Sequence, residues 1–267
     1  MMSFIRSPAV AGTFYPADAV TLSSQIRAFL GEAGEDVGRA PKAIIAPHAG
    51  YIYSGPVAAH AYAHIKPLKG IVERVVLLGP CHRVPVMGVA LSSADSFRTP
   101  LGTVDVDHGL DGVLLTHPQV QVYDATHAQE HSLEVHIPFL QVLLGDFKLL
   151  PMVVGQASPI EVAEILECVW GGPETLIVIS SDLSHYLDYD SACTMDRRTC
   201  AAIEHFDYNA IADGQACGRM PIKGLLELAR RKGMQVRTLD LRNSGDTAGP
   251  RDQVVGYGSW GFWEVAP

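Results

Sequence analysis

The sequence predicts an α/β fold, a three-layer sandwich with a mostly parallel or mixed central sheet flanked by helices. Short apolar runs alternate with helical patterns, and several runs lack the polar alternation of a strand that has one face in water. Hydrophobic residues make up 48% of the chain and charged residues only 18%. A chain of 267 residues buries roughly 70–75% of its unfolded surface, so one substantial core is possible, and we expect residues 1–267 to form one domain.

The apolar runs are the expected strands, and they recur through the whole chain. In order they are Lys42–Pro47, Arg74–Gly79, Val86–Leu91, Leu149–Val154, Thr175–Ser180, Gln235–Leu239 and Val254–Glu264. The last of these contains several glycines, so we expect a bulge in it. Phe97–Asp107 is expected to form a separate β excursion.

Helical patterns separate many of these runs. The first expected helix is Asp18–Leu30, with Asp18 as its N-cap and Gly31 as its stop. The others are Gly55–Ile65, Ser132–Leu144, Pro159–Trp170, Ser191–His205 and Ile222–Lys232. Ser132 has the position of an N-cap in its helix, and Pro138 is tolerable there only close to the helix start.

Composition excludes several classes of protein. The formal net charge is −9, whereas a nucleic-acid-binding surface needs a basic footprint. No apolar run approaches the roughly 18–20 residues of a membrane span, and the first residues lack the pattern of a signal peptide. The five cysteines are odd in number, widely spaced and without a CxxC pair, which favours reduced thiols and a cytoplasmic location.

The chain has 11 histidines, and the position of several is informative. The first buried-type run is followed by His48, the second by Cys81 and His82, and the fifth by Asp182 and His185. In open α/β sheets, ligands bind at the edge where the carboxyl ends of the strands meet. We therefore expect His48 and His82 to meet in space.

Metal binding is the chemistry that this pattern favours. Imidazole ligates iron, copper and zinc in its neutral form, and two histidines with one carboxylate form the non-haem iron arrangement. The carboxylates that could supply the third ligand are Asp182, Asp246 and Glu130. The alternative is that these histidines only form hydrogen bonds with the backbone of their loops.

A second group of histidines lies in the segment THAQEHSLEVH. His127, Glu130 and His131 match the HxxEH pattern of a zinc protease, in which one helix presents both histidines. If Ser132 caps the following helix, however, both histidines precede that helix. We therefore expect Glu130, His131 or Glu134 at the rim of the same cleft, with a merely helix-capping acidic segment as the alternative.

Other features point to the same edge or exclude further chemistry. Tyr51 could line the pocket or simply pack, and Cys81 could be reactive or simply a small buried residue. The glycines lack the spacing of a dinucleotide or ATP site, and no GxSxG elbow of a serine hydrolase occurs.

Several motifs together resemble those of the Memo family, named AmmeMemoRadiSam system protein B in bacteria and archaea. They are Arg6–Pro16, Ala46–Gly55, Leu77–His82, Glu130–Pro138, Ser180–His185 and Val255–Tyr257, and they span nearly the whole chain. This family is similar in fold to the LigB-type class III extradiol dioxygenases. The resemblance therefore implies a central sheet flanked by helices, with a metal cleft at one edge.

The resemblance also implies the members of the site. His48 and His82 would be metal ligands, and a third ligand would come from the loop before the last strand. In that loop Asp246 is the expected ligand, Thr247 is the alternative, and Ser244 is a neighbour. A hypothesis for catalysis follows, in which His185, oriented by Asp182, is the acid or base.

The sequence thus predicts a protein with one divalent metal, iron first, with copper or zinc as alternatives. The leading function is a dioxygenase-like oxidoreductase acting on an unknown small molecule or peptide. The family name implies radical SAM and Ammecr-type partner proteins. Two alternatives stay open, a zinc hydrolase and a non-catalytic protein whose cleft binds a peptide or partner.

Overall fold

A parallel four-stranded centre forms the middle of the main sheet. The computed structural model describes residues 3–34 and 38–265. The central strands, in spatial order, are β2 (Ala43–Ala46), β9 (Thr175–Ser180), β3 (Arg74–Pro80) and β8 (Lys148–Val154). Each is parallel to its neighbour, and nearly every residue in them is buried, which explains why these runs show no polar alternation.

The margins of this sheet make it mixed. On one side, β12 (Val254–Trp263) runs antiparallel to β2 and also pairs with β10 (His185–Leu187) and β11 (Gln235–Asn243). On the other side, β4 (Val89–Leu91) runs antiparallel to β8 and pairs with β7 (Val120–Val122). A separate small sheet joins β1 (Ile5–Arg6), β5 (Ser96–Thr99) and β6 (Gly102–Asp105), so the expected β excursion is present.

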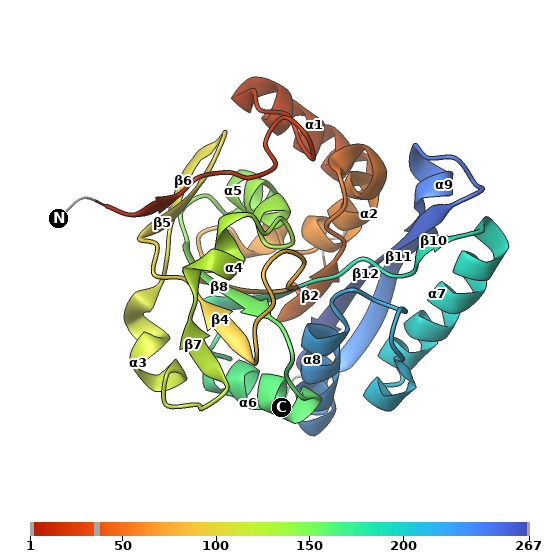
Figure 1. Cartoon of the computed structure of the whole chain (residues 1–267). Coiled ribbons are helices and arrows are strands. Elements are labelled where there is room, and N and C mark those ends of the chain that lie inside the picture. The colour runs from red at the N-terminus through yellow and green to blue at the C-terminus, as the bar shows by residue number, and fades with distance from the viewer. Residues whose placement is uncertain (1–2, 35–37, 266–267) are drawn as a thin grey trace.

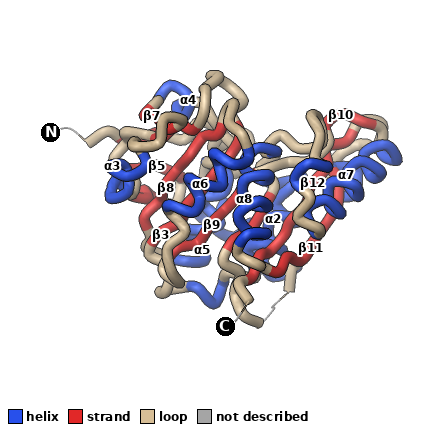
Figure 2. The backbone as a smooth tube through the Cα atoms, turned by 90° about the horizontal axis from the view of Figure 1, so that it is seen from below, coloured by secondary structure: helices blue, strands red, loops and turns tan. Residues whose placement is uncertain are grey.

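Helices cover both faces of the main sheet and complete the three layers (Figures 1 and 2). One face carries α1 (Ala19–Glu32), α2 (Tyr51–Ala63) and α5 (Ile137–Leu144). The other carries α6 (Pro159–Cys168), α7 (Tyr189–Glu204) and α8 (Arg219–Arg231). The short helices are α3 (Asp111–Leu114), α4 (Asp124–Ala128), α9 (Ser244–Thr247) and the 3₁₀ turns Lys66–Leu68, His108–Leu110, Glu134–His136 and Tyr208–Ala210.

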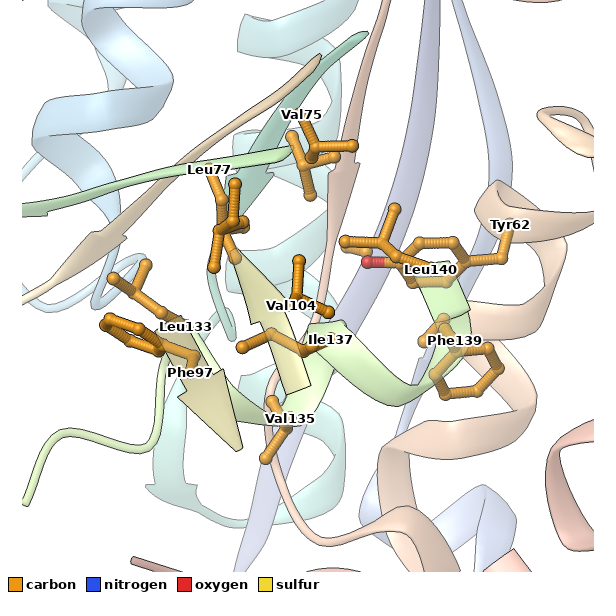
Figure 3. Close-up of a cluster of buried hydrophobic side chains, with 14 of the residues drawn as sticks. Tyr62, Val75, Leu77, Phe97, Val104, Leu133, Val135, Ile137, Phe139 and Leu140 are labelled. Atoms are coloured by element: carbon orange, nitrogen blue, oxygen red, sulfur yellow. The ribbon is translucent and has the colours of Figure 1, made fainter. Parts of the chain in front are cut away.

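Two hydrophobic cores, one under each helical layer, hold the sandwich together. Figure 3 shows part of the first, where Leu77 from β3, Phe97 from β5 and Tyr62 from α2 gather around the start of α5. Tyr62 stacks on Phe139 with ring centroids 4.8 Å apart. The expected α/β architecture is therefore confirmed, and the structural reason is burial of both faces of the sheet.

Several helix boundaries differ from the sequence prediction; α2 begins at Tyr51 rather than Gly55, and α8 at Arg219 rather than Ile222. Asp18 caps α1 by accepting from the backbone N–H of Thr21, as expected, but Gly31 does not end the helix, which continues to Glu32. Ser132 is not an N-cap. Its hydroxyl donates to the carbonyl of Pro80, and the chain first makes the 3₁₀ turn Glu134–His136 before α5 begins.

Two strand details also differ. The expected strand Val86–Leu91 begins only at Val89, because Gly88 has φ +77° and lies so close to the Gln119 carbonyl that a Cβ would be 2.0 Å from its oxygen. The bulge expected in the last strand lies in its partner instead, where Leu239 is the extra residue of β11 between two paired positions.

Among the described residues, no helix has both the length and the apolar character needed to cross a membrane.

Candidate functional site

Three histidines from distant parts of the chain converge at the carboxyl-end edge of the central strands. His48 follows β2, His82 follows β3, and His131 lies between α4 and the turn before α5. Their ligand nitrogens lie within 4.8 Å of one another, and the ring centroids are 4.7–5.4 Å apart. The sequence predicted the meeting of His48 and His82, and this spacing is compatible with a single shared metal ion.

His131 reaches this edge because its segment is fastened to the ends of two strands. The Ser132 hydroxyl donates to the Pro80 carbonyl at 2.9 Å, and the Ser132 carbonyl accepts from the Ser180 hydroxyl at 2.6 Å. A Cβ on Gly79 would lie 2.7 Å from the Ser132 oxygen, so only glycine permits this close approach. These contacts place His131 beside the residues that follow β3 and β9.

The hydrogen bonds around His48 fix its tautomer. The Ser180 hydroxyl donates its hydrogen bond to the Ser132 carbonyl, so its oxygen must accept from Nδ1–H of His48, 2.6 Å away. The other nitrogen, Nε2, therefore carries the lone pair. Burial holds the pKa of His48 well below its usual value, so the ring is neutral at pH 7.

His82 is oriented by a carboxylate in the same way. Glu130 accepts from the backbone N–H of His82 at 2.6 Å, from its Nδ1 at 2.9 Å and from the N–H of Ser132 at 2.9 Å. Burial alone would raise the pKa of Glu130, but these hydrogen bonds lower it to about 2. An ionised Glu130 leaves the proton on Nδ1 and the lone pair on Nε2, the arrangement common for metal-ligating histidines.

His131 is the third imidazole and has a buried nitrogen without a hydrogen bond. Among the described residues, its Nδ1 has no hydrogen-bond partner; the nearest carboxylate oxygen, on Glu130, is 3.5 Å away. Burial lowers the pKa of His131 to about 4, so the ring is neutral at pH 7. The ring of Phe14 lies against it with centroids 4.8 Å apart. Three imidazoles this close together fit a divalent metal, which binds the neutral form of the ring.

Asp182 and Cys217 border the same group. Asp182 accepts from the backbone N–H of His48 at 2.8 Å, and its other oxygen lies 3.8 Å from His48 Nε2. Burial raises the pKa of Asp182 to about 6. The Cys217 sulfur lies 3.3 Å from the same nitrogen, and burial raises the pKa of its thiol well above the usual range. A bound metal could deprotonate this thiol.

His185 lies close to this group but is not oriented as expected. Its Nδ1 donates to the carbonyl of Leu183 at 2.8 Å, whereas Asp182 accepts from His48. His185 acts electrostatically on both Asp182 and His48. Asp182 therefore positions the His48 loop, and a backbone carbonyl orients His185.

The structure does not bring Asp246 into the histidine group. Its carboxylate accepts from the backbone N–H of Asn243 at 3.1 Å, a bond that caps the short helix α9. It also accepts from the Tyr189 hydroxyl at 2.7 Å. Ser244 accepts from the N–H of Val255, and Thr247 donates to the carbonyl of Ser244. In this structure His131, and not Asp246, is the third member of the group that could hold a metal ion.

The remaining predicted residues have structural contacts. Glu134 is buried and pairs with Arg6, and it also accepts from the Tyr15 hydroxyl at 2.5 Å and from two backbone N–H groups. Tyr51 is buried in the first core and donates to the carbonyl of Val135. Cys81 is half-buried and donates to the carbonyl of Val84 at 2.7 Å.

The protease-like HxxEH arrangement is not formed. His127 is buried within α4, and its Nε2 lies 3.0 Å from the carbonyl of Ala90. It is not a member of the histidine group, whereas His131 is. Because α4 ends at Ala128, no single helix carries both histidines on one face.

Sequence reasoning missed Cys217. It lies just before α8, and its backbone N–H donates to the Asp182 carbonyl while its sulfur accepts from the Asp182 N–H. No local pattern indicates this, since the two residues are 35 positions apart. The structure explains the approach, because Cys217 is followed by Gly218, where a Cβ would be 2.3 Å from the Ser180 carbonyl.

Comparisons with known proteins agree with this architecture. A solved structure from Escherichia coli K12, the uncharacterized protein JW3007, matches with a TM-score of 0.56 and 10% identity, covering 82% of this chain and 99% of the other. At that identity the likeness concerns the fold alone.

Sequence relatives cover nearly the entire chain. A MEMO1 family protein of Sulfolobus acidocaldarius is 39% identical over 279 residues, covering 95% of this chain and 97% of the relative. One from Aquifex aeolicus is also 39% identical, over 269 residues with the same coverage. The family model described as Memo-like protein matches residues 6–260. The resemblance in the motifs is thereby confirmed, and the chain belongs to the Memo family.

Proposed function

We propose that this chain is a metal-dependent oxidoreductase whose mononuclear iron is held by His48, His82 and His131. The observation that carries the proposal is the fixed tautomer of the first two rings. Ser180 and Glu130 each accept a hydrogen bond from an Nδ1–H group, which leaves both Nε2 lone pairs available. The third ring has a buried nitrogen that lacks a hydrogen bond within the described part of the chain.

The surroundings favour iron over zinc or copper. The proposed ligands are three imidazoles, and Asp182, 3.8 Å from His48 Nε2, adds a carboxylate of the kind that accompanies histidines in non-haem iron sites. The Cys217 sulfur lies 3.3 Å from the same nitrogen, but burial keeps its thiol protonated; a thiolate ligand there would instead favour copper or zinc. When bound, the metal would supply redox chemistry and polarise an oxygen atom of a substrate.

The side chains around the histidines are suited to hold and move a proton. Burial raises the pKa of Asp182 to about 6, close to the pH at which a general acid or base is most effective. His185, whose Nδ1 donates to Leu183, keeps Nε2 available for a second proton transfer. Glu130 is not suited to this role, because its pKa of about 2 makes it a weak base.

The last point also bears on the zinc hydrolase alternative. A zinc hydrolase could be built on the same histidine group or on His127, Glu130 and His131; the second form needs Glu130 as the base that activates water, with His127 as a ligand. Glu130 instead accepts three hydrogen bonds from His82 and Ser132, and His127 lies outside the histidine group. The geometry therefore argues against the form of the hydrolase that uses His127 and Glu130, and metal analysis decides between the oxidoreductase and a hydrolase on the same histidine group.

Anaerobic metal analysis of the purified protein tests the proposal. We expect stoichiometric iron in the wild type, and loss of the metal in His48→Ala and in His82→Ala. His205→Ala, which changes an exposed histidine at the end of α7, should retain the metal. A wild-type protein that binds no iron when it is reconstituted with Fe(II), or two histidine variants that bind it as tightly as the control, would refute the proposal.

A further inference from the structure

A small pocket opens beside the histidine group. Its volume is about 260 Å³, and its wall includes His82 and Cys217, which also border the proposed metal. This volume is somewhat below the roughly 300–1,000 Å³ typical of pockets for drug-sized ligands, so it suits a small molecule or one end of a larger molecule. The molecule that occupies it would contact the metal site directly.

The charge of this pocket is opposite to that of the protein. Arg83 and Arg219 line it, and no aspartate or glutamate is among its lining residues in the described chain. The protein as a whole has a formal net charge of −9. Two guanidinium groups within one small pocket of an acidic protein favour an anionic ligand, because arginine presents a fork of donors that matches a carboxylate.

Both arginines are available to a ligand. Among the described residues, Arg83 forms no ion pair with a carboxylate, and its charge acts on the pKa of the neighbouring His131. Arg219 pairs with Asp213 at 2.5 Å, but that carboxylate is 85% exposed. Such exposed pairs contribute little free energy, so a ligand could replace Asp213 at small cost.

The start of α8 adds to the positive potential. Arg219, Met220 and Pro221 are the first residues of this 13-residue helix and also line the pocket. The N-cap residue, Gly218, offers no side chain to cap them. The helix dipole therefore reinforces the attraction of the two arginines for an anion.

The rest of the lining is mostly apolar. Val86, Val154 and Met220 contribute to the wall, and Gln156 adds an uncharged polar group. An apolar wall beside two cations is typical of a site that holds a hydrocarbon or aromatic body by burial and a charged end by ion pairing. A simple inorganic anion would leave this apolar surface unused.

We propose that the pocket binds a small organic acid, with its carboxylate on Arg83 and Arg219 and its body against the apolar wall. The inference rests on the proposed function, because it assigns the substrate class of that same metal site. The acid would extend from the arginines toward the edge marked by His82 and Cys217. It is therefore a carboxylate-bearing substrate for the proposed oxidoreductase.

An NMR titration with acetate and benzoate tests this assignment. Acetate is too small to be excluded by shape, and acetamide and benzamide are the matched neutral probes. With the iron-loaded protein held anaerobic and with the metal-free protein, we expect each acid to bind at least tenfold more tightly than its amide. Arg83→Gln and Arg219→Gln should each weaken benzoate binding about tenfold, the loss expected for one charge-assisted contact.

The controls separate this inference from the proposed function. Arg197→Gln, which changes an exposed arginine on α7 outside the pocket, should bind benzoate like the wild type. Circular dichroism and iron content verify that each variant is folded and loaded. Equal binding of acids and amides, or arginine variants that match the control, would overturn the inference, as would binding of inorganic phosphate without either acid. If the inference fails in one of these ways but iron binds normally, the proposed function stands. If benzoate binding depends on the arginines but the protein binds no iron, the proposed function is rejected and the pocket assignment stands.

Discussion

Two polar segments at the same edge of the sheet differ in what their carboxylates contact. The segment from Glu130 to His136 bonds to distant parts of the chain: Glu130 accepts from His82, and Glu134 from Arg6 and Tyr15. In the loop after β11, Asp246 caps its own short helix by accepting from Asn243 three residues away, and it also accepts from the Tyr189 hydroxyl on α7. Both segments carry acidic and hydroxyl side chains, so composition does not distinguish them.

The difference shows what builds a site in this fold. A carboxylate that joins distant segments fixes their relative position, and through Glu130 it also fixes the tautomer of a candidate ligand. A carboxylate that caps its own short helix satisfies local N–H groups and has little left for a metal. We expect substitutions in the first segment to have large effects and those in the loop to have small ones.

Glu134→Gln should have the largest effect on stability. Glu134 and Arg6 are both buried, and the two carboxylate oxygens also accept from Tyr15 and from two backbone N–H groups. Glutamine removes the charge and places an NH2 group against some of these donors, so the free energy of unfolding should fall by about 3–5 kcal/mol. Urea unfolding of the metal-free protein measures this free energy.

The matched control for that experiment is an exposed ion pair. Glu167 on α6 pairs with Arg231 at 3.4 Å, and its side chain is 54% exposed. Glu167→Gln should change the free energy of unfolding by less than about 1 kcal/mol. If Glu134→Gln lowers the free energy of unfolding by no more than Glu167→Gln does, the carboxylate of Glu134 does not fix distant segments together, and the comparison fails.

His131→Ala should weaken metal binding by about 100-fold, or about 2.7 kcal/mol, because it removes one of three ligands. His127→Ala is the matched variant, since it changes another buried histidine four positions earlier that faces the Ala90 carbonyl. It should lower stability and leave metal affinity unchanged. Competition with a metal chelator of known affinity measures both, and equal losses in the two variants would reject His131 as the ligand.

His136 should make stability depend on pH. Burial lowers its pKa to about 3, whereas an unfolded histidine titrates near about 6.5. Between these two pH values the unfolded state binds a proton that the folded state does not. The contribution of His136 to the free energy of unfolding is therefore complete above about pH 6.5 and decreases as the pH falls. Acidification from pH 7 to pH 5 should therefore cost about 2 kcal/mol through this residue alone.

The comparison of wild type with His136→Gln isolates that contribution. The variant keeps an acceptor for the Tyr62 hydroxyl, which lies 2.8 Å from His136 Nδ1, but it does not titrate. In the metal-free protein, the stability advantage of the wild type at pH 7 should shrink by about 2 kcal/mol at pH 5. A constant difference across this range would show that His136 does not contribute.

The sequence predicted well whatever depends on burial along a strand. Thr175–Ser180 has the boundaries expected, and the apolar runs before His48 and His82 place both residues at one edge. It predicted less well where hydrogen bonds to distant residues determine the position of a side chain. Ser132 looks like a local cap, yet its hydroxyl bonds to Pro80, and that contact brings His131 into the site. The local spacing of residues around Ser132 does not indicate a partner so distant in the sequence.

The smallest effect should come from Asp246→Ala, which tests the loop side of the comparison. The substitution removes the capping bond to Asn243 and the acceptor for Tyr189, so stability should fall by about 1 kcal/mol. Metal affinity should be the same as in the wild type, because the carboxylate lies outside the histidine group. Chelator competition and urea unfolding on the same preparation separate the two quantities. A tenfold loss of metal affinity at unchanged stability would make Asp246 a ligand and would mean that the loop rearranges when the metal binds.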